Sequence, residues 1–265
     1  MADSVPQRRE RLVTAVARRG FARVVDLSRE LGVSEVTVRT DLAALEADGR
    51  VTRVHGGAMP RGLVAERESS LEQSRGRLTR AKEAIAQAAA ARVQSGHSVL
   101  LDVGSTTLAV AHALVARVEL QEVVVVTNGL AIALALEPGI PRLTVVVTGG
   151  TLRSLQHSLV NPLATTLLDG VRADVAILGA TGVHLDHGVT NVNLPETEVK
   201  RRMVTSASRR ILVADSSKIG QAHLGHVAAL AEIDELITDT AITDADAAAL
   251  RAAGPHVHAV APTRR

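Results

Sequence analysis

A glycine followed by three hydroxyl-bearing residues offers the chemistry of a phosphate-binding loop. Gly104, Ser105, Thr106 and Thr107 come directly after an apolar run that predicts a buried strand. Glycine lets the backbone approach an anion closely, and a helix that starts there presents free N–H groups and the positive end of its dipole. A capped helix start without a ligand is the plainer interpretation. The spacing fits neither a Walker P-loop nor the GxGxxG fingerprint of dinucleotide sites.

Polar residues also follow the other predicted strands of this region. Ligands bind beyond the carboxyl ends of the strands in open α/β sheets, so these residues should meet at one edge. Lys218 is the expected phosphate contact, because its loop comes directly after a strand. The candidate ligand-binding residues are Asp102, Gly104, Ser105, Thr106, Thr107, Asn128, Gly149, Gly150, Gly179, Glu196, Lys200, Asp215 and Lys218.

Glu196 and Lys200 stand at i and i+4 on a helix predicted over 195–207. Such a pair is most often exposed to solvent and contributes about a few tenths of a kcal/mol. Beside Asp215 and Lys218 the two could instead bind sugar hydroxyls and phosphate. Histidines recur with H-x-x-H spacing, but a metal site needs further converging ligands. We therefore expect loop histidines, no metal and no cofactor.

A parallel sheet is needed to bring the strand-end residues to one edge. Short, almost continuously apolar runs alternate with helical stretches, as expected of strands buried on both faces. This alternation predicts a Rossmann-like α/β domain with right-handed crossovers. The predicted strands are 98–103, 123–127, 143–148, 175–178, 211–214 and 236–238, and a helix is predicted over 81–93.

The amino-terminal stretch contains a second candidate site. Ser34 is a good N-cap, and Val38, Leu42 and Leu45 form one apolar stripe of the helix that follows. Gly49 ends this helix in the left-handed conformation that glycine favours. The exposed residues on the other faces of the helix are polar or carry a guanidinium group.

Helices predicted over 8–19 and 26–31, a tight turn at Gly32 and an alternating strand over 50–54 complete a winged helix-turn-helix. In this motif the second helix lies in the major groove of duplex DNA. A three-helix domain with a solvated, arginine-rich surface and no DNA target is the plainer interpretation. The candidate DNA-binding residues are Ser34, Glu35, Thr37, Arg39, Thr40, Arg53 and His55.

The length and charge distribution predict two domains joined by a linker. We place a DNA-binding domain at 1–60, a linker at 61–80 and a ligand-binding domain at 81–265. Residues 1–82 carry 16 Lys and Arg against 11 Asp and Glu, whereas the remainder carries 14 against 17. A basic end on an acidic body suits a module that contacts phosphates, although a moderate excess is also common on solvated surfaces.

Composition also limits the cellular compartment and the kind of nucleic acid that the protein could bind. The chain has no cysteine, so it has neither disulfides nor thiolate metal sites, and a reducing cytoplasm fits. The first residues lack the apolar core of a signal peptide, and the longest apolar runs are too short to span a bilayer. Phe21 is the only Phe, Tyr or Trp, which leaves little for stacking on single-stranded bases. We expect a cytoplasmic protein that reads duplex DNA and does not enter membranes.

Residues 32–58 resemble the amino-terminal signature of the DeoR family of bacterial transcriptional regulators. Many members have a second arginine where this chain has Thr40, so the operator sequence cannot be copied from relatives. The positions that carry the resemblance are Ser34, Thr37, Arg39, Asp41, Leu42, Leu45, Gly49, Arg53, His55, Gly56 and Gly57.

The second domain also resembles this family, and through it the fold of ribose-5-phosphate isomerase. The resemblance implies that a phosphorylated sugar or polyol is the effector and relieves repression when it binds. Many relatives carry an aspartate where this chain has Thr181, which leaves the sugar less defined than the phosphate. The segments that carry the resemblance are 101–107, 126–128, 148–150, 196–201 and 214–220.

Two classes of function follow from these expectations. The first is a ligand-responsive repressor that binds duplex operator DNA as a homo-oligomer, a dimer or a tetramer. The alternative is a sugar-phosphate isomerase-like enzyme with an appended DNA-binding domain. Glu196, Asp215 and Lys218 could serve its proton transfer, but Thr181 replaces an expected acid. The winged helix favours the regulator.

Overall fold

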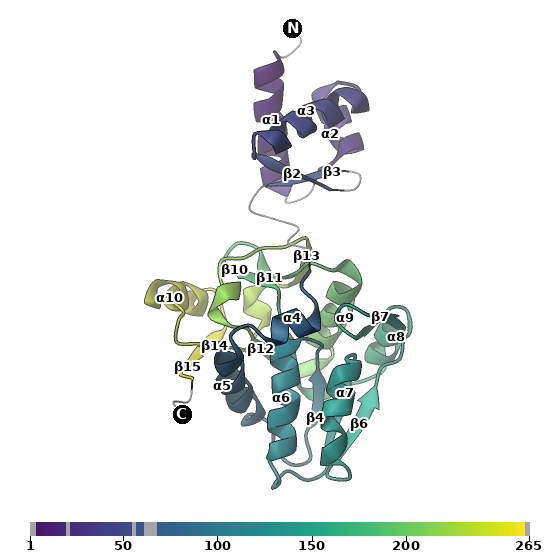
Figure 1. The fold of residues 1–265 in the computed structure, drawn as a ribbon, viewed down its shortest axis with the longest axis vertical. Helices are drawn as coiled ribbons and strands as arrows, with labels where there is room; N and C mark the ends of the chain where they lie inside the picture. The colour runs from purple at the N-terminus through teal and green to yellow at the C-terminus, as the bar shows by residue number, and fades with distance from the viewer. Residues whose placement is uncertain (1–3, 20–21, 55–56, 61–67, 263–265) are drawn as a thin grey trace. The chain divides into compact units, whose positions relative to one another are not determined.

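The computed structural model describes residues 4–19, 22–54, 57–60 and 68–262 (Figure 1). The chain divides into two compact units, Met1–Arg67 and Glu68–Arg265. Each unit has a hydrophobic core of its own.

The first unit contains three helices and a small antiparallel sheet with strand order β1-β3-β2. Val38, Leu42 and Leu45 are buried, which confirms the predicted apolar stripe. Gly32 and Gly49 have φ angles of 65° and 67°, the left-handed conformation that the tight turn and the helix end require. The elements are α1 (Val5–Arg19), β1 (Ala22–Arg23), α2 (Val24–Leu31), α3 (Glu35–Ala47), β2 (Val51–Val54) and β3 (Gly57–Pro60).

The second unit is built on a seven-stranded parallel sheet with the order β15-β14-β12-β9-β4-β5-β6. The predicted α/β fold is confirmed, and all six predicted strands are present, 123–127 with the predicted ends and the other five with shifted ends. The edge strand β15 was not predicted, because its apolar residues are interrupted by histidines. The strands are β4 (Ser98–Leu101), β5 (Val123–Thr127), β6 (Leu143–Val147), β9 (Ala173–Gly179), β12 (Ala207–Val213), β14 (Glu235–Asp239) and β15 (His256–Val260).

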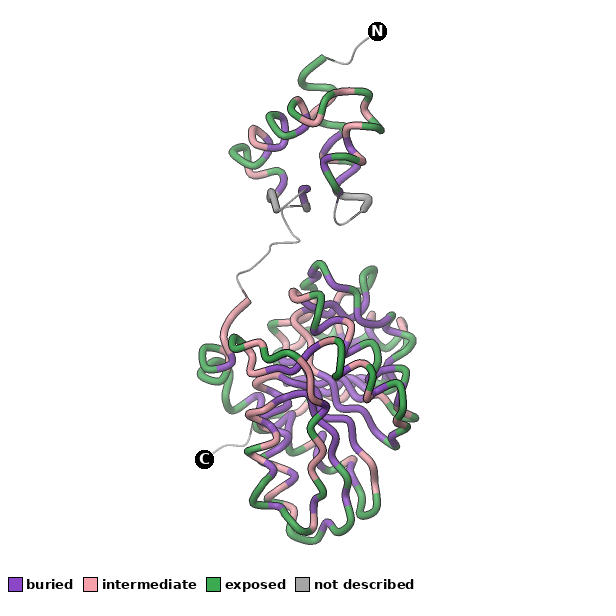
Figure 2. Tube along the Cα trace, turned by 90° about the vertical axis from the view of Figure 1, so that its right-hand side faces the viewer, coloured by how far each residue is buried: buried purple, intermediate pink, exposed green. Residues whose placement is uncertain are grey.

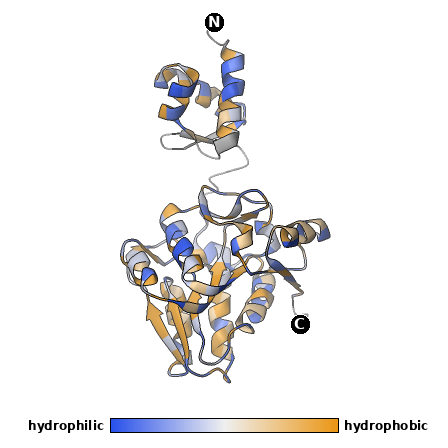
Figure 3. Ribbon diagram, turned by 180° about the vertical axis from the view of Figure 1, so that it is seen from behind, coloured by the Kyte–Doolittle hydropathy of each residue, from blue (hydrophilic) through white to orange (hydrophobic). Residues whose placement is uncertain are grey.

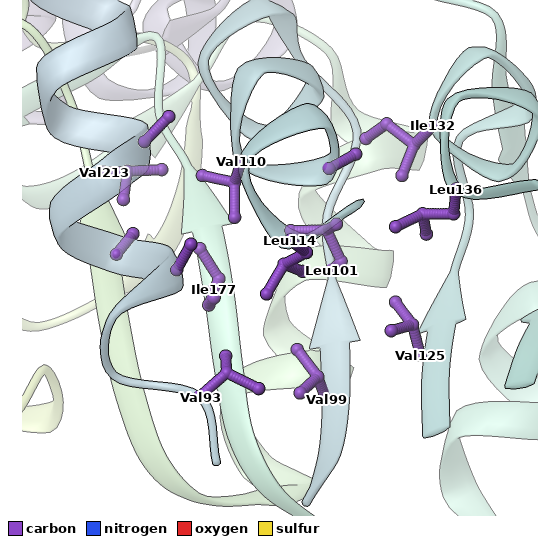
Figure 4. Close-up of a cluster of buried hydrophobic side chains, with 14 of the residues drawn as sticks. Val93, Val99, Leu101, Val110, Leu114, Val125, Ile132, Leu136, Ile177 and Val213 are labelled. Atoms are coloured by element: carbon purple, nitrogen blue, oxygen red, sulfur yellow. The ribbon is translucent and has the colours of Figure 1, made fainter. Parts of the chain in front are cut away.

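Helices cover both faces of this sheet. The cluster on one face includes Leu101, Leu114, Val125 and Ile177 (Figure 4), and a second cluster fills the other face. The central strands are buried (Figure 2) and predominantly hydrophobic (Figure 3). The first face is covered by α5 (Thr79–Ala90), α6 (Ser105–Ala116) and α7 (Leu130–Leu136), and the second by α8 (Leu163–Asp169), α9 (Leu194–Thr205) and α10 (Asp244–Ala252).

Several short elements were not predicted. They are the hairpin β7 (Thr151–Arg153) with β8 (Ser158–Val160), a small sheet of β10 (Gly182–His184), β11 (Gly188–Asn191) and β13 (Gly225–Ala228), and the 3-10 turns η1 (Glu137–Gly139), η2 (Ser216–Lys218) and η3 (Leu230–Glu232).

The carboxyl-terminal part of the linker predicted over 61–80 is ordered. Residues 68–80 belong to the second unit, where α4 (Leu71–Arg75) forms and Leu71 is buried in the core. Ser70 and Gln73 make a capping box, which supports this helix despite its sparse apolar content. Among the described residues, no helix has both the length and the apolar character needed to cross a membrane.

Candidate functional site

The start of α3 is fixed by the predicted N-cap. Ser34 Oγ accepts a hydrogen bond from the Thr37 backbone N–H at 3.1 Å. The two hydroxyl oxygens lie 2.8 Å apart. Both side chains therefore stand at the amino-terminal end of α3, the end that faces base edges in helix-turn-helix proteins.

Arg39 lies on the exposed side of α3, away from the buried stripe. Its Nη2 atom donates to Glu35 Oε2 at 2.9 Å, and both side chains are largely accessible to solvent. Thr40 is also exposed and donates to the Val36 carbonyl at 3.0 Å. An exposed i,i+4 pair is worth little in free energy, so Glu35 holds the Arg39 guanidinium only weakly.

Asp41 is buried in the first unit, a role that sequence reasoning missed. Its carboxylate accepts from Arg8 Nε at 2.6 Å and from Arg9 Nε at 3.0 Å, and so joins α3 to α1. Burial raises the pKa of Asp41, but the hydrogen bonds and charges of the two arginines outweigh it, and the pKa is lowered. The available signal in the sequence was the position of Asp41 beside the apolar stripe of Val38, Leu42 and Leu45.

The last two candidate DNA-binding residues lie near the β2–β3 turn. Arg53 is in β2, where its backbone stands opposite Ala58 of β3. The strand β2 of this antiparallel pair corresponds to the alternating strand predicted over 50–54. His55 and Gly56 lie outside the described residues, so the predicted glycine turn is not described.

In the second unit, strand-end residues meet at one edge, which we call the sheet rim: residues 102–107, 128, 179–181 and 215–218. Asp102 follows β4 and is fully buried; its Oδ2 accepts from the Gly179 N–H at 2.9 Å and from Lys200 Nζ. Lys200 Nζ also donates to the Gly179 carbonyl at 3.1 Å. Burial raises the pKa of Asp102, and Lys200 only partly offsets that effect. Asp102 Oδ1 is buried without a hydrogen-bond partner.

Of the two interpretations of Glu196 and Lys200, the solvent-exposed pair is excluded, and their role as ligand contacts stays a prediction. Both side chains are buried, and each has a partner far away in the chain. Glu196 accepts from Arg153 Nη1 and from Ser158 Oγ, the latter at 2.5 Å. The i,i+4 spacing is the same for exposed and buried residues, so it could not distinguish the two cases.

Gly104 caps α6 with a φ of 144°, a conformation open to glycine but strained for other residues. Thr107 is buried, and its hydroxyl donates to the Gly104 carbonyl at 3.0 Å, which fixes the turn. Ser105 and Thr106 lie in the first turn of α6, where backbone N–H groups have no partner within the helix. This geometry is that of a capped helix start, and the binding of a phosphate by the loop stays a prediction.

The amide and glycine candidates shape the rim. Asn128 is buried: its Oδ1 accepts from the Val103 N–H at 3.1 Å, and its Nδ2 donates to the Leu159 carbonyl at 3.4 Å. Gly150 has a φ of 120°, and a Cβ there would lie 2.1 Å from the Val160 carbonyl oxygen. Gly149 also has a positive φ, of 73°. Asn128 therefore supports the rim through its own hydrogen bonds, and Gly150 allows the close approach of the Val160 backbone.

Lys82 is a cation near the rim that sequence reasoning missed. It is buried at the start of α5, and its Nζ donates to the Ser74 carbonyl at 2.5 Å. Burial lowers its pKa, the charge of Asp215 raises it, and Lys218 and Arg77 lower it further. The charges of Lys82 and Lys218 are therefore close enough to interact. The signal was a lysine on the apolar face of a predicted helix, one turn before Ile85.

Asp215 and Lys218 belong to the turn after β12. The Asp215 carboxylate accepts from the Ser217 N–H at 3.1 Å and from the Ser217 hydroxyl, which caps η2. Lys218 is half-buried at the end of this turn. The carboxylate is thus engaged in shaping the loop that carries the lysine.

Thr181, where an acid was expected from the resemblance, has local partners. Its hydroxyl donates to Asn191 Oδ1 at 2.5 Å and accepts from the Val192 N–H at 3.3 Å. It therefore ties the loop after β9 to the end of β11. In the described part of the chain, no group of three or more His, Cys, Asp and Glu residues is placed to hold a metal ion.

Comparison with known proteins gives matches over both units. The DeoR-like helix-turn-helix domain matches residues 8–60, and the DeoR C terminal sensor domain matches residues 78–240. The HTH-type transcriptional regulator GlpR of Haloferax volcanii is 36% identical over 91% of this chain and 91% of its own length. The Glycerol-3-phosphate regulon repressor of Escherichia coli is 28% identical over 88% of this chain and 90% of its own.

A solved ribose 5-phosphate isomerase from Plasmodium falciparum is similar in part of its fold. It matches with a TM-score of 0.39 and 19% identity, over 52% of each chain. The two domain matches together cover the winged helix and most of the parallel-sheet unit. The chain belongs to the DeoR family of transcriptional regulators.

Proposed function

We propose that the chain represses a sugar or polyol catabolic operon and releases its operator when a phosphorylated sugar or polyol occupies the sheet rim. The exposed side of α3, with Arg39 at its centre, reads duplex DNA. The wing at Arg53 contacts the phosphate backbone. The protein acts as a homo-oligomer, because helix-turn-helix regulators commonly bind paired half-sites. It acts in the cytoplasm, where bacterial operator DNA lies.

One observation above all supports a hydroxyl-rich ligand. Asp102 Oδ1 is buried at the rim without a hydrogen-bond partner, and such an atom costs free energy until a donor satisfies it. A sugar or polyol hydroxyl would supply that donor. Lys218 of the rim and the nearby Lys82, together with the amino-terminal end of α6, would hold the phosphate.

The same contacts argue against an enzyme. Proton transfer at a sugar carbon needs a carboxylate that is free to act as the base. Asp102 is held by Lys200, Glu196 by Arg153 and Ser158, and Asp215 by its own turn. Each carboxylate can accept a further hydrogen bond from a ligand hydroxyl, but none is free to move to a sugar carbon as a base. We therefore propose that the rim binds its ligand without converting it.

Calorimetric titration tests this function. Glycerol 3-phosphate, glucose 6-phosphate and glucosamine 6-phosphate would be compared with glycerol, glucose and glucosamine. Binding of at least one phosphorylated compound, and of none of the unphosphorylated ones, is expected. Equal binding of the phosphorylated and unphosphorylated forms would contradict a phosphate site. If wild type binds none of the six compounds, the proposed effector class is contradicted.

A further inference from the structure

The segment Glu68–Leu71, which we call the entry segment, is held by the β7–β8 hairpin. It is the first described part of the second unit and follows residues 61–67 in the chain. Gln156 Nε2 donates to the Ser69 carbonyl at 2.5 Å, and the Leu71 N–H donates to the Leu155 carbonyl at 2.9 Å. The position of the entry segment therefore depends on the position of this hairpin.

The third contact of the entry segment is an ion pair that also includes Glu196, one of the predicted ligand contacts. Arg153 of β7 binds Glu68 through two nitrogens, Nη1 at 3.2 Å and Nη2 at 2.7 Å. Its Nη1 atom also donates to Glu196, which is buried in the first turn of α9. The three side chains are less than one-fifth exposed. One guanidinium thus serves two carboxylates where solvent screens their charges weakly.

We propose that Arg153 transmits ligand occupancy from the rim to the entry segment by dividing its hydrogen bonds between Glu196 and Glu68. This inference rests on the proposed effector function. Ligand hydroxyls that donate to Glu196 replace part of its bond with Arg153. The guanidinium then binds Glu68 more fully, and the entry segment is held more tightly. A ligand can shift such an equilibrium only through this difference in contacts.

The coupling can be tested first without any ligand. Glu196→Gln removes the competing charge, so hydrogen exchange at the Leu71 amide should slow. Glu68→Gln removes the other end of the pair, so exchange there should become faster. An effect of roughly tenfold in either direction corresponds to about 1.4 kcal/mol in local opening. Asp234→Asn, which breaks an ion pair with Arg210 elsewhere in the unit, is the matched control and should change nothing at Leu71.

The opposite signs make this test decisive, because general destabilisation speeds exchange in every variant. Faster or unchanged exchange in Glu196→Gln would overturn the coupling. The second arm adds glucosamine 6-phosphate, glucose 6-phosphate or glycerol 3-phosphate to wild type and to Glu68→Gln. A compound that binds both proteins should slow exchange at Leu71 in wild type alone.

The two arms separate the coupling from the effector assignment. If Glu196→Gln slows exchange but no compound binds wild type, the coupling stands and the proposed effector class is wrong. If a compound binds wild type and leaves exchange at Leu71 unchanged, the coupling is overturned and the effector class stands.

Discussion

Lys200 Nζ binds Asp102 Oδ2 inside the second unit, although the two residues are 98 positions apart in the sequence. Lys200 comes from α9 and Asp102 follows β4, so the pair joins a helix on one face of the sheet to the carboxyl end of a central strand. Both side chains are almost inaccessible to solvent. The contact fixes the carboxylate that we propose as an acceptor for ligand hydroxyls.

Replacement of Lys200 should therefore lower the stability of the second unit. Lys200→Met leaves Asp102 buried without its counter-ion, and breaking a buried pair in this way costs about 3–5 kcal/mol. Urea denaturation should show a lower midpoint for this unit. The double variant with Asp102→Asn should recover part of the loss, because no buried charge remains. Equal midpoints for Lys200→Met and wild type would show that the pair is not buried in solution.

The first unit should lose stability in acid through Asp41. Its pKa is lowered by Arg8 and Arg9 in the folded state, so its contribution is present above the unfolded-state pKa of about 3.9 and is lost as pH falls through the folded-state value. Asp41→Asn should lower stability by about 1–3 kcal/mol at neutral pH and remove this part of the acid dependence. Thermal melts from pH 7 to pH 2, with Asp48→Asn as the exposed control, measure both effects. An unchanged acid dependence would refute the assignment to Asp41.

Operator affinity should depend on the guanidinium of Arg39. Arg39→Ala should weaken specific binding by about 1–3 kcal/mol if the side chain makes a bidentate base contact. Arg29→Ala, an exposed arginine of α2, is the comparison variant. Gel-shift titrations on the operator and on an unrelated duplex separate base recognition from phosphate contact. Wild-type affinity in Arg39→Ala would exclude this side of α3 as the recognition surface.

The wing should contribute through phosphates rather than bases. Arg53→Ala should weaken specific and unrelated duplexes alike and reduce the salt slope by about one contact. Affinities measured over a series of salt concentrations give that slope. A loss confined to the operator sequence would instead indicate that Arg53 reads a base.

The sequence was sufficient for the elements that depend on local patterns. Three local signals define α3: the capping residue Ser34, the apolar stripe that includes Leu42, and the left-handed residue Gly49 at its end. The parallel strands follow from apolar runs, because both faces of the sheet are buried. By contrast, the three-residue strands of the β7–β8 hairpin are too short to show a period.

The side-chain partners at the rim could not be predicted in the same way. Glu196 and Lys200 share a helix, yet they bind Arg153 and Asp102, which only the folded sheet brings near. Lys82 of α5 and Lys218 after β12 are far apart in the sequence, and only the fold brings their charges near each other. Such contacts depend on topology, which residue spacing within one helix does not encode.

The central claim is that a phosphorylated ligand held at the rim causes operator release, and one titration tests it directly. Operator release would be measured against the concentration of the phosphorylated compound that binds wild type, for wild type, Lys218→Ala and Thr106→Ala. Charge-assisted hydrogen bonds contribute about 1.5–3 kcal/mol each, so Lys218→Ala should need roughly ten- to a hundredfold more compound while binding operator normally. Thr106→Ala should shift in the same direction. Release curves identical to wild type in both variants would contradict the claim, and loss of operator binding with the fold intact would mean that the rim serves assembly instead.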